Sequence, residues 1–266
     1  MGEHTGRQSI DNLERGWASI SELCDGLTDE EWATPTGCPG WTVQDQISHL
    51  IDYEAGALGR PRPDHVPADL SHTKNALGES NEVGVDARRG RSGPEVLEEL
   101  REVTAARVAQ LRGLSDEDFA REVPTPAGPG TVSDMLRLRV MDTWSHEQDI
   151  RRALGRPGHD TGPVVEESLD YFGRFLPLLV GKRAGAADGQ SVVFVLGHEP
   201  PVRILVTDGR ANTVDQLPGE PTATLTMPAT TFAALVGGRS DVPDDVEVAG
   251  DAALAQRVLD TLGFMP

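Results

Sequence analysis

Apolar residues in the first part of this chain recur at steps of three and four, and this period limits the fold more than any other feature. Residues 5–27 carry one such stripe, which is typical of an amphipathic helix. Three further stripes cover residues 42–59, 92–112 and 131–154, and each begins at a Ser or Thr with an acidic residue three positions later. That spacing marks a capped helix N-terminus. Four long helices of this kind predict a four-helix bundle.

The connection between the second and third of these helices is long. Residues 61–91 are rich in Pro, Gly, Asp and Asn and show little period. The segment is therefore either a plain crossover or a crossover that carries a short helix.

The pattern changes after Pro157. Residues 161–180 predict one more helix, and short β-branched segments separated by Gly and Pro follow it. The predicted strands are residues 191–196, 202–206 and 223–227, and the later helical segments are residues 232–236 and 252–262. We therefore expect a domain of the α class followed by a domain of the α+β class. The first is a bundle over residues 1–157, and the second is a small domain over residues 158–266 with helices on one face of a mixed sheet.

Charge and composition exclude several classes of protein. The formal net charge is −19, which repels phosphate backbones and anionic lipid head groups, so nucleic acid is not an expected partner. Nothing approaches the run of about 18 apolar residues that a spanning helix needs, and the first residues do not resemble a secretory signal. The chain is expected in the cytoplasm. Cys24 and Cys38 are the only cysteines, so a metal ion would be held by His and carboxylate groups.

One face of the helix over residues 131–154 gathers groups that can bind a metal. Asp142 and His146 are four positions apart, Asp149 follows, and Arg139 lies on the same face. A carboxylate and an imidazole one turn apart converge near the helix, as in metal sites of helical bundles. His49, which points away from the apolar stripe of its own helix, is the candidate third ligand. The alternative is a solvated face with an ordinary ion pair, and a surface histidine at position 49.

Two segments are distinctive: CPGWTV at residues 38–43, which leads to His49, and DTWSHEQDI at residues 142–150. In these segments the chain resembles the mycothiol-dependent maleylpyruvate isomerase family, part of the DinB-like superfamily. The segments ATLTM at 223–227 and VAGD at 248–251 are similar to the sterol-carrier-related domain that follows the bundle in this family. The resemblance therefore covers nearly the whole chain and implies a DinB-like bundle followed by that small α/β domain.

The resemblance also implies a metal site. Family members bind zinc through a His on the second helix and a Glu-x-x-x-His pair on the fourth, which map onto His49, Asp142 and His146. Asp142 stands where the family has Glu, so its shorter carboxylate leaves the identity of the divalent metal open. Asp149 is expected to orient the ring of His146, and Arg139 to pair with a substrate carboxylate or, alternatively, to form a salt bridge within the bundle.

The activity implied by the resemblance uses a low-molecular-weight thiol, mycothiol, as cosubstrate. A divalent ion, zinc above all, would hold the thiol as a thiolate. The sulfur would then attack a small electrophile, either to isomerise a double bond or to remain attached in S-transfer. Two other functions stay open: a non-catalytic carrier or binding protein for a small molecule or lipid, and a metal-dependent hydrolase at the same site.

Overall fold

The protein is described by a computed structural model that covers residues 5–126, 128–241 and 243–264. The chain divides into two compact units, the first ending at Ser168 and the second beginning at Leu169. Compactness alone does not show where an independently folding domain ends, so the division at residue 157 stays a prediction. None of the helices in the described ranges combines the length and the hydropathy that a membrane span requires.

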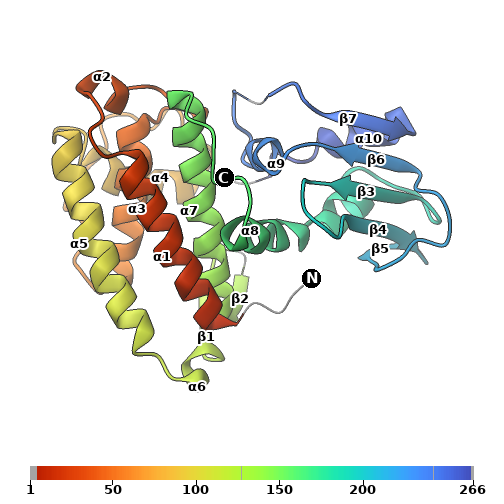
Figure 1. Ribbon diagram of the computed structural model, residues 1–266, viewed down its shortest axis with the longest axis horizontal. Coiled ribbons are helices and arrows are strands. Elements are labelled where there is room, and N and C mark those ends of the chain that lie inside the picture. Colours follow the sequence, from red (N-terminus) through yellow and green to blue (C-terminus); the bar gives the residue numbers. More distant parts are fainter. Residues whose placement is uncertain (1–4, 127, 242, 265–266) are drawn as a thin grey trace. The chain divides into compact units, whose positions relative to one another are not determined.

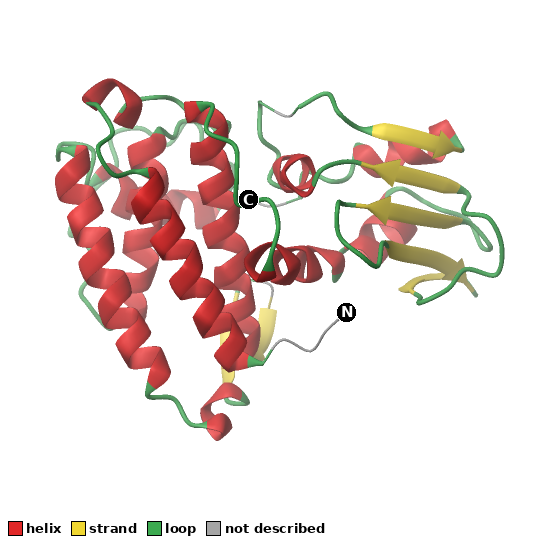
Figure 2. Ribbon diagram, in the orientation of Figure 1, coloured by secondary structure: helices red, strands yellow, loops and turns green. Residues whose placement is uncertain are grey.

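The first unit is built on four long helices, which confirms the predicted bundle (Figures 1 and 2). They are α1 (Gly6–Leu23), α3 (Val43–Ala57), α5 (Gly93–Arg112) and α7 (Val132–Leu154). Helix α1 packs against α5 and α7, and α3 packs against the same two helices. Each long helix thus has two neighbours, and α3 and α7 share an interface.

The helix ends follow from local sequence signals. Thr42 and Asp45 form a capping box at the start of α3, and Thr131 and Asp134 form one at the start of α7. Such caps contribute about 1 kcal/mol each because they satisfy amide groups that lack a partner in the helix. Gly155 ends α7 in the left-handed conformation, with φ of 62°, which glycine adopts without steric cost.

A continuous apolar core joins the facing sides of these helices. It consists of Ile20, Leu23, Cys24, Leu27, Trp32, Val43, Ile47, Leu50, Ile51, Val96, Leu97, Leu100, Val103 and Ile150. Helix α3 contributes both to this core and to a second, polar interior, because Gln46, His49 and Glu54 are buried as well.

Shorter elements connect the long helices. The segment over residues 61–91 is a crossover with a short helix, α4 (Ala76–Asp86). Two single-turn helices, α2 (Asp29–Trp32) and α6 (Asp116–Phe119), follow α1 and α5. A hairpin of β1 (Glu122–Thr125) and β2 (Gly128–Thr131) precedes α7 and was not predicted.

The second unit contains a five-stranded sheet in the order β5-β4-β3-β6-β7. The strands are β3 (Ser191–Val195), β4 (Val202–Thr207), β5 (Arg210–Thr213), β6 (Ala223–Thr226) and β7 (Glu247–Gly250). Strands β3 and β6 are parallel and the other pairs are antiparallel, so the sheet is mixed, as predicted. Strands β5 and β7 were not predicted.

Helical segments accompany this sheet. They are α9 (Ala229–Val236), α10 (Ala252–Leu259) and a π-helix, η1 (Leu178–Arg183). Helix α10 packs against β6, and η1 packs against β5. The single helix predicted over residues 161–180 is wrong in its extent, since α8 (Pro163–Gly173) ends at a glycine. Pro177, which has no amide hydrogen to donate, then precedes η1.

Candidate metal centre

The three predicted ligands meet where α3 and α7 pack together. One ring nitrogen of His49, one of His146 and a carboxylate oxygen of Asp142 all lie within 4.8 Å of one another. His49 Nε2 is 3.3 Å from Asp142 Oδ2, and His146 Nε2 is 3.5 Å from Asp142 Oδ1. Ligand atoms around a tetrahedral zinc ion are roughly 3.4 Å apart, given bond lengths of about 2.0–2.2 Å. The spacing of the three groups therefore fits a small divalent cation.

These ligand groups are shielded from solvent, unlike the solvated face that the sequence left open. His49 and His146 are buried and Asp142 is partly buried. Helical spacing accounts for the arrangement, since Gln46 and His49 are three positions apart on α3 and Asp142 and His146 are four apart on α7. The two polar faces meet inside the bundle.

The protonation states favour metal binding. Burial lowers the pKa of His49, although the hydrogen bond and charge of Asp142 oppose that shift, so the imidazole is neutral at neutral pH. Burial by itself would raise the pKa of Asp142, but the Arg139 guanidinium, together with His146 and His49, outweighs it and holds that pKa well below its usual range. A neutral imidazole and an ionised carboxylate are the forms that coordinate metals.

Arg139 lies beside the site in a buried ion-pair network. Its Nε donates to Glu54 Oε1 at 2.8 Å, and one terminal nitrogen contacts Asp142 Oδ2 at 2.5 Å. The guanidinium also stacks on the ring of Tyr53, 3.8 Å from its centroid. This is the salt bridge within the bundle that was the alternative to substrate binding. Its second terminal nitrogen is buried and has no hydrogen-bond partner among the described residues.

Two buried residues of α3 belong to this network but were missed in the sequence. Glu54 bridges Arg139 and Arg107, with Arg107 Nε 3.1 Å from Oε2. Gln46 places Oε1 2.5 Å from His146 Nδ1. The available signal was position: Gln46 lies one turn before His49, and Glu54 is a charged residue in line with the apolar stripe of its helix.

Asp149 was expected to orient His146. Its Oδ2 is 3.7 Å from His146 Nδ1, beyond hydrogen-bond distance, and its Oδ1 pairs with Arg152 at 2.5 Å. Gln46 is the closer partner of that nitrogen, and the role of Asp149 stays a prediction.

The CPGWTV segment positions an aromatic cover over the two imidazoles. The ring of Trp41 is 5.2 Å from that of His49 and 5.9 Å from that of His146, measured between centroids. Trp41 Nε1 donates to the buried Glu82 at 2.9 Å, which fixes the indole. An apolar ring here excludes water from one side of the ligand groups.

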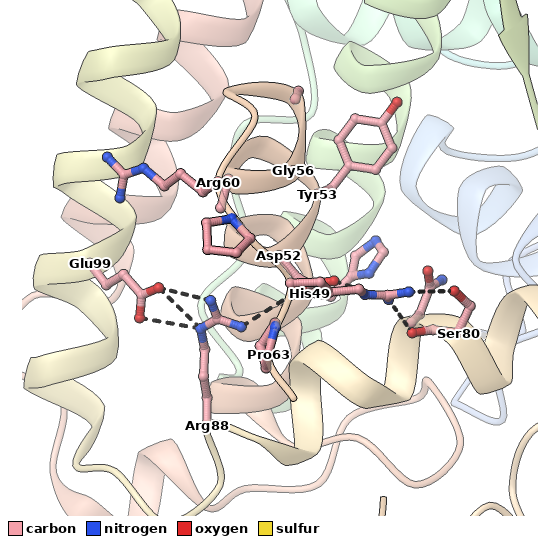
Figure 3. A pocket seen from close by; sticks show the side chains of 14 residues that line it. His49, Asp52, Tyr53, Gly56, Arg60, Pro63, Ser80, Arg88 and Glu99 are labelled. Atoms are coloured by element: carbon pink, nitrogen blue, oxygen red, sulfur yellow. Dashed lines mark hydrogen bonds and ion pairs between the residues drawn. The ribbon is translucent and has the colours of Figure 1, made fainter. Parts of the chain in front are cut away.

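A cavity of about 670 Å³ adjoins the site through His49, the one candidate ligand among its lining residues. Its volume is in the range of small-molecule pockets. Figure 3 shows charged side chains on its wall, with Arg88 lying between Glu99 and Asp52. Tyr53, whose ring stacks against the Arg139 guanidinium, also lines this cavity. The cavity therefore borders the ion-pair network as well as His49.

Comparisons with known proteins agree with this architecture. Crystal structures of the mycothiol-dependent maleylpyruvate isomerase and of a mutant of that enzyme superpose with TM-scores of 0.57 and 0.55. Their sequence identities to this chain are 18% and 17%, and each match covers 93% of this chain and 94% of the other. At such identities the likeness shows the fold.

Two uncharacterized proteins of Mycobacterium tuberculosis, from strains CDC 1551 and H37Rv, are each 30% identical over 139 residues. Each match covers 51% of this chain and 52% of the relative, so the chain spans about half the length of these curated relatives.

Two family models match the chain. The Mycothiol maleylpyruvate isomerase N-terminal domain matches residues 13–151, and the MDMPI C-terminal domain matches residues 166–257. The first match alone covers more than half of the sequence and contains all three candidate ligands. This chain therefore belongs to the mycothiol-dependent maleylpyruvate isomerase family.

Proposed function

We propose that this protein is a mycothiol-dependent isomerase of a small electrophile and that His49, Asp142 and His146 hold a divalent ion, zinc, for that reaction. The observation that carries the proposal is the convergence of these three groups within 4.8 Å, from two helices. Burial lowers the pKa of His49, and Arg139 holds the pKa of Asp142 well below its usual range, so these two groups are in the forms that bind metals. Three protein ligands leave a coordination position for an exogenous ligand, as in catalytic zinc sites.

The surrounding charges favour an anion at that position. Asp142 and Glu54 carry two negative charges, and Arg139 and Arg107 carry two positive ones, so the network is neutral by itself. The protein therefore does not cancel the charge of a bound dication. Zinc in such a site would supply a Lewis acid that keeps a thiol in its thiolate form.

Arg139 and the cavity would bind the electrophile. The unpaired terminal nitrogen of Arg139 is a buried donor suited to a substrate carboxylate. The neighbouring cavity has room for a small molecule and begins at His49. Trp41 keeps water from the imidazoles on its side, which protects a thiolate from protonation by solvent.

Family membership supports the identity of the thiol and the class of reaction. The related crystal structures are of an isomerase that depends on mycothiol. In such a reaction the thiol sulfur adds to one carbon of the substrate double bond and a proton balances the charge. The single bond rotates, and elimination of the thiol restores the double bond in the other geometry.

The test is incubation of the purified protein with mycothiol and a panel of unsaturated dicarboxylates that includes maleylpyruvate, followed by chromatography and mass spectrometry. We expect a product of unchanged mass, formed only with the thiol present, and no turnover after the metal is removed by dialysis against a chelator.

Other outcomes would identify other functions. A product whose mass is the sum of thiol and electrophile would show S-transfer. A gain of one water without any need for thiol would show hydrolysis. Tight binding of an apolar ligand without turnover of any compound would favour a carrier protein and contradict the proposed enzyme.

A further inference from the structure

Gln46 occupies a position inside the bundle that the proposed chemistry does not yet use. It is fully buried on α3, one turn before His49, and both ends of its amide have a partner. Its Oε1 faces His146 Nδ1 at 2.5 Å, and its Nε2 faces Thr36 Oγ1 at 2.7 Å. The amide thus connects a candidate ligand on α7 to the loop that precedes α3.

The direction of these hydrogen bonds follows from the surroundings of the Thr36 hydroxyl. That hydroxyl has one proton, which it donates to the carbonyl oxygen of Trp41 at 2.9 Å. The backbone amide of Cys38 donates to the same oxygen at 3.3 Å. Thr36 Oγ1 must therefore accept from Gln46, because a carbonyl can only accept and a backbone amide can only donate. The NH2 group of Gln46 faces Thr36, and its carbonyl oxygen faces His146.

The orientation of Gln46 determines which nitrogen of His146 carries a proton. Nδ1 approaches a carbonyl oxygen, so Nδ1 must be the donor. In the neutral ring the lone pair then resides on Nε2, which faces Asp142 Oδ1 at 3.5 Å. A divalent ion between these two acceptors would bind both the Nε2 lone pair and the carboxylate oxygen.

We propose that Thr36 and Gln46 are positioning residues that fix His146 in the tautomer protonated on Nδ1, so that Nε2 is the metal-binding atom. This inference rests on the proposed metal centre. Metal-bound histidines usually donate their second ring N–H to a carboxylate or a backbone carbonyl, which fixes the ring. Here a side-chain amide takes that place, and its orientation is set by a hydroxyl in the CPGWTV loop region.

Backbone contacts hold the loop before α3 in place. The backbone N–H of Thr36 donates a hydrogen bond to the Trp41 carbonyl oxygen at 2.9 Å, and Pro35 pairs with Thr42 in an isolated antiparallel bridge. A shift of this loop would move the Thr36 hydroxyl and release the amide of Gln46. The loop thus holds both the aromatic cover, Trp41, and the start of the hydrogen-bond chain to His146.

The test compares zinc affinity, by competition with a chromogenic chelator, in the wild type and in Gln46→Met, Gln46→Glu and Gln44→Met. Methionine keeps the length of the side chain but cannot accept from Nδ1, so we expect a loss of 10 to 100-fold. Glutamate keeps the acceptor, and we expect affinity within a few-fold of the wild type. Gln44→Met is the matched control: the side chain of Gln44 bonds to the carbonyls of Arg88 and Arg91 at 3.1 Å and does not touch the site.

A second measurement does not depend on variants that might lose their fold. Heteronuclear NMR of the zinc-loaded wild type, labelled with ¹⁵N-histidine, should show His146 protonated on Nδ1 and coordinated through Nε2. The reverse pattern would overturn the proposal, and so would Gln46→Met that binds zinc as tightly as the wild type. A wild type that binds no zinc would instead overturn the metal centre itself, which separates the two failures.

Discussion

Replacement of Glu54 by Gln should strongly destabilise the helical bundle. The Glu54 carboxylate is 1% exposed and lies between two guanidinium groups, with Arg139 at 2.8 Å and Arg107 at 3.1 Å. Gln46 and the ligand side chains are not altered by this change. The variant keeps the shape of the side chain and removes its charge. Among the described residues, the guanidinium of Arg139, 2% exposed, then has Asp142 as its one anionic partner.

The expected loss is about 3–5 kcal/mol, the usual cost of removing one partner of a buried ion pair. With a urea m-value of about 2 kcal/mol/M, the midpoint of unfolding should fall by roughly 2 M. All four tryptophans lie between residues 17 and 144, so their fluorescence reports on the bundle alone. A chelator in the buffer keeps metal binding from adding to the measured stability.

Glu102→Gln is the matched control. Glu102 pairs with Arg60 at 2.9 Å, but its side chain is 65% exposed, so its loss should cost less than about 1 kcal/mol. Equal effects of the two substitutions, or a Glu54→Gln variant within 1 kcal/mol of the wild type, would refute the reasoning that burial makes the Glu54 network strong.

Two further predictions concern the ligands and the cysteines. Asp142→Glu should retain zinc. Asp142→Ala should weaken zinc binding by far more than the roughly 10 to 100-fold expected of Asp149→Ala, because a direct ligand supplies both a bond and a charge. Metal titration measures the order of the two effects, and a reversed order would exchange the roles of the two carboxylates. Burial, assisted by the charge of Glu147, raises the pKa of Cys24 to about 12. At pH 8 a thiol reagent should therefore label Cys38 alone in the native protein and both cysteines in denaturant. Rapid labelling of two thiols in the native protein would contradict the buried environment of Cys24.

The long helices were predictable because their signals are local. The apolar period and the capping residues at Thr42, Ser92 and Thr131 lie within a few residues of the helix starts that they define. Strands β1, β2 and β7 lack such signals. Pro124 and Pro129 occupy the hairpin, and all four residues of β7 are exposed, so no alternation of apolar and polar residues marks them.

The site was predictable in part for the same reason. Asp142 and His146 share a helix, and their spacing alone places them together, but the contact of His49 with them depends on how α3 packs on α7. Gln46 and Glu54 could not be assigned partners from the sequence, because their partners lie 100 and 85 positions away. Long-range hydrogen bonds of this kind follow from tertiary packing and leave no local pattern.

The most direct test of the metal centre is the zinc content of the protein purified without a chelator, measured by inductively coupled plasma mass spectrometry beside His146→Ala. Since His146 would be one of three protein ligands, its removal leaves too few groups to hold the ion against water. We expect close to one equivalent of zinc or a similar divalent ion in the wild type and background metal in the variant. Background metal in the wild type would contradict both the site and the proposed metal-dependent chemistry.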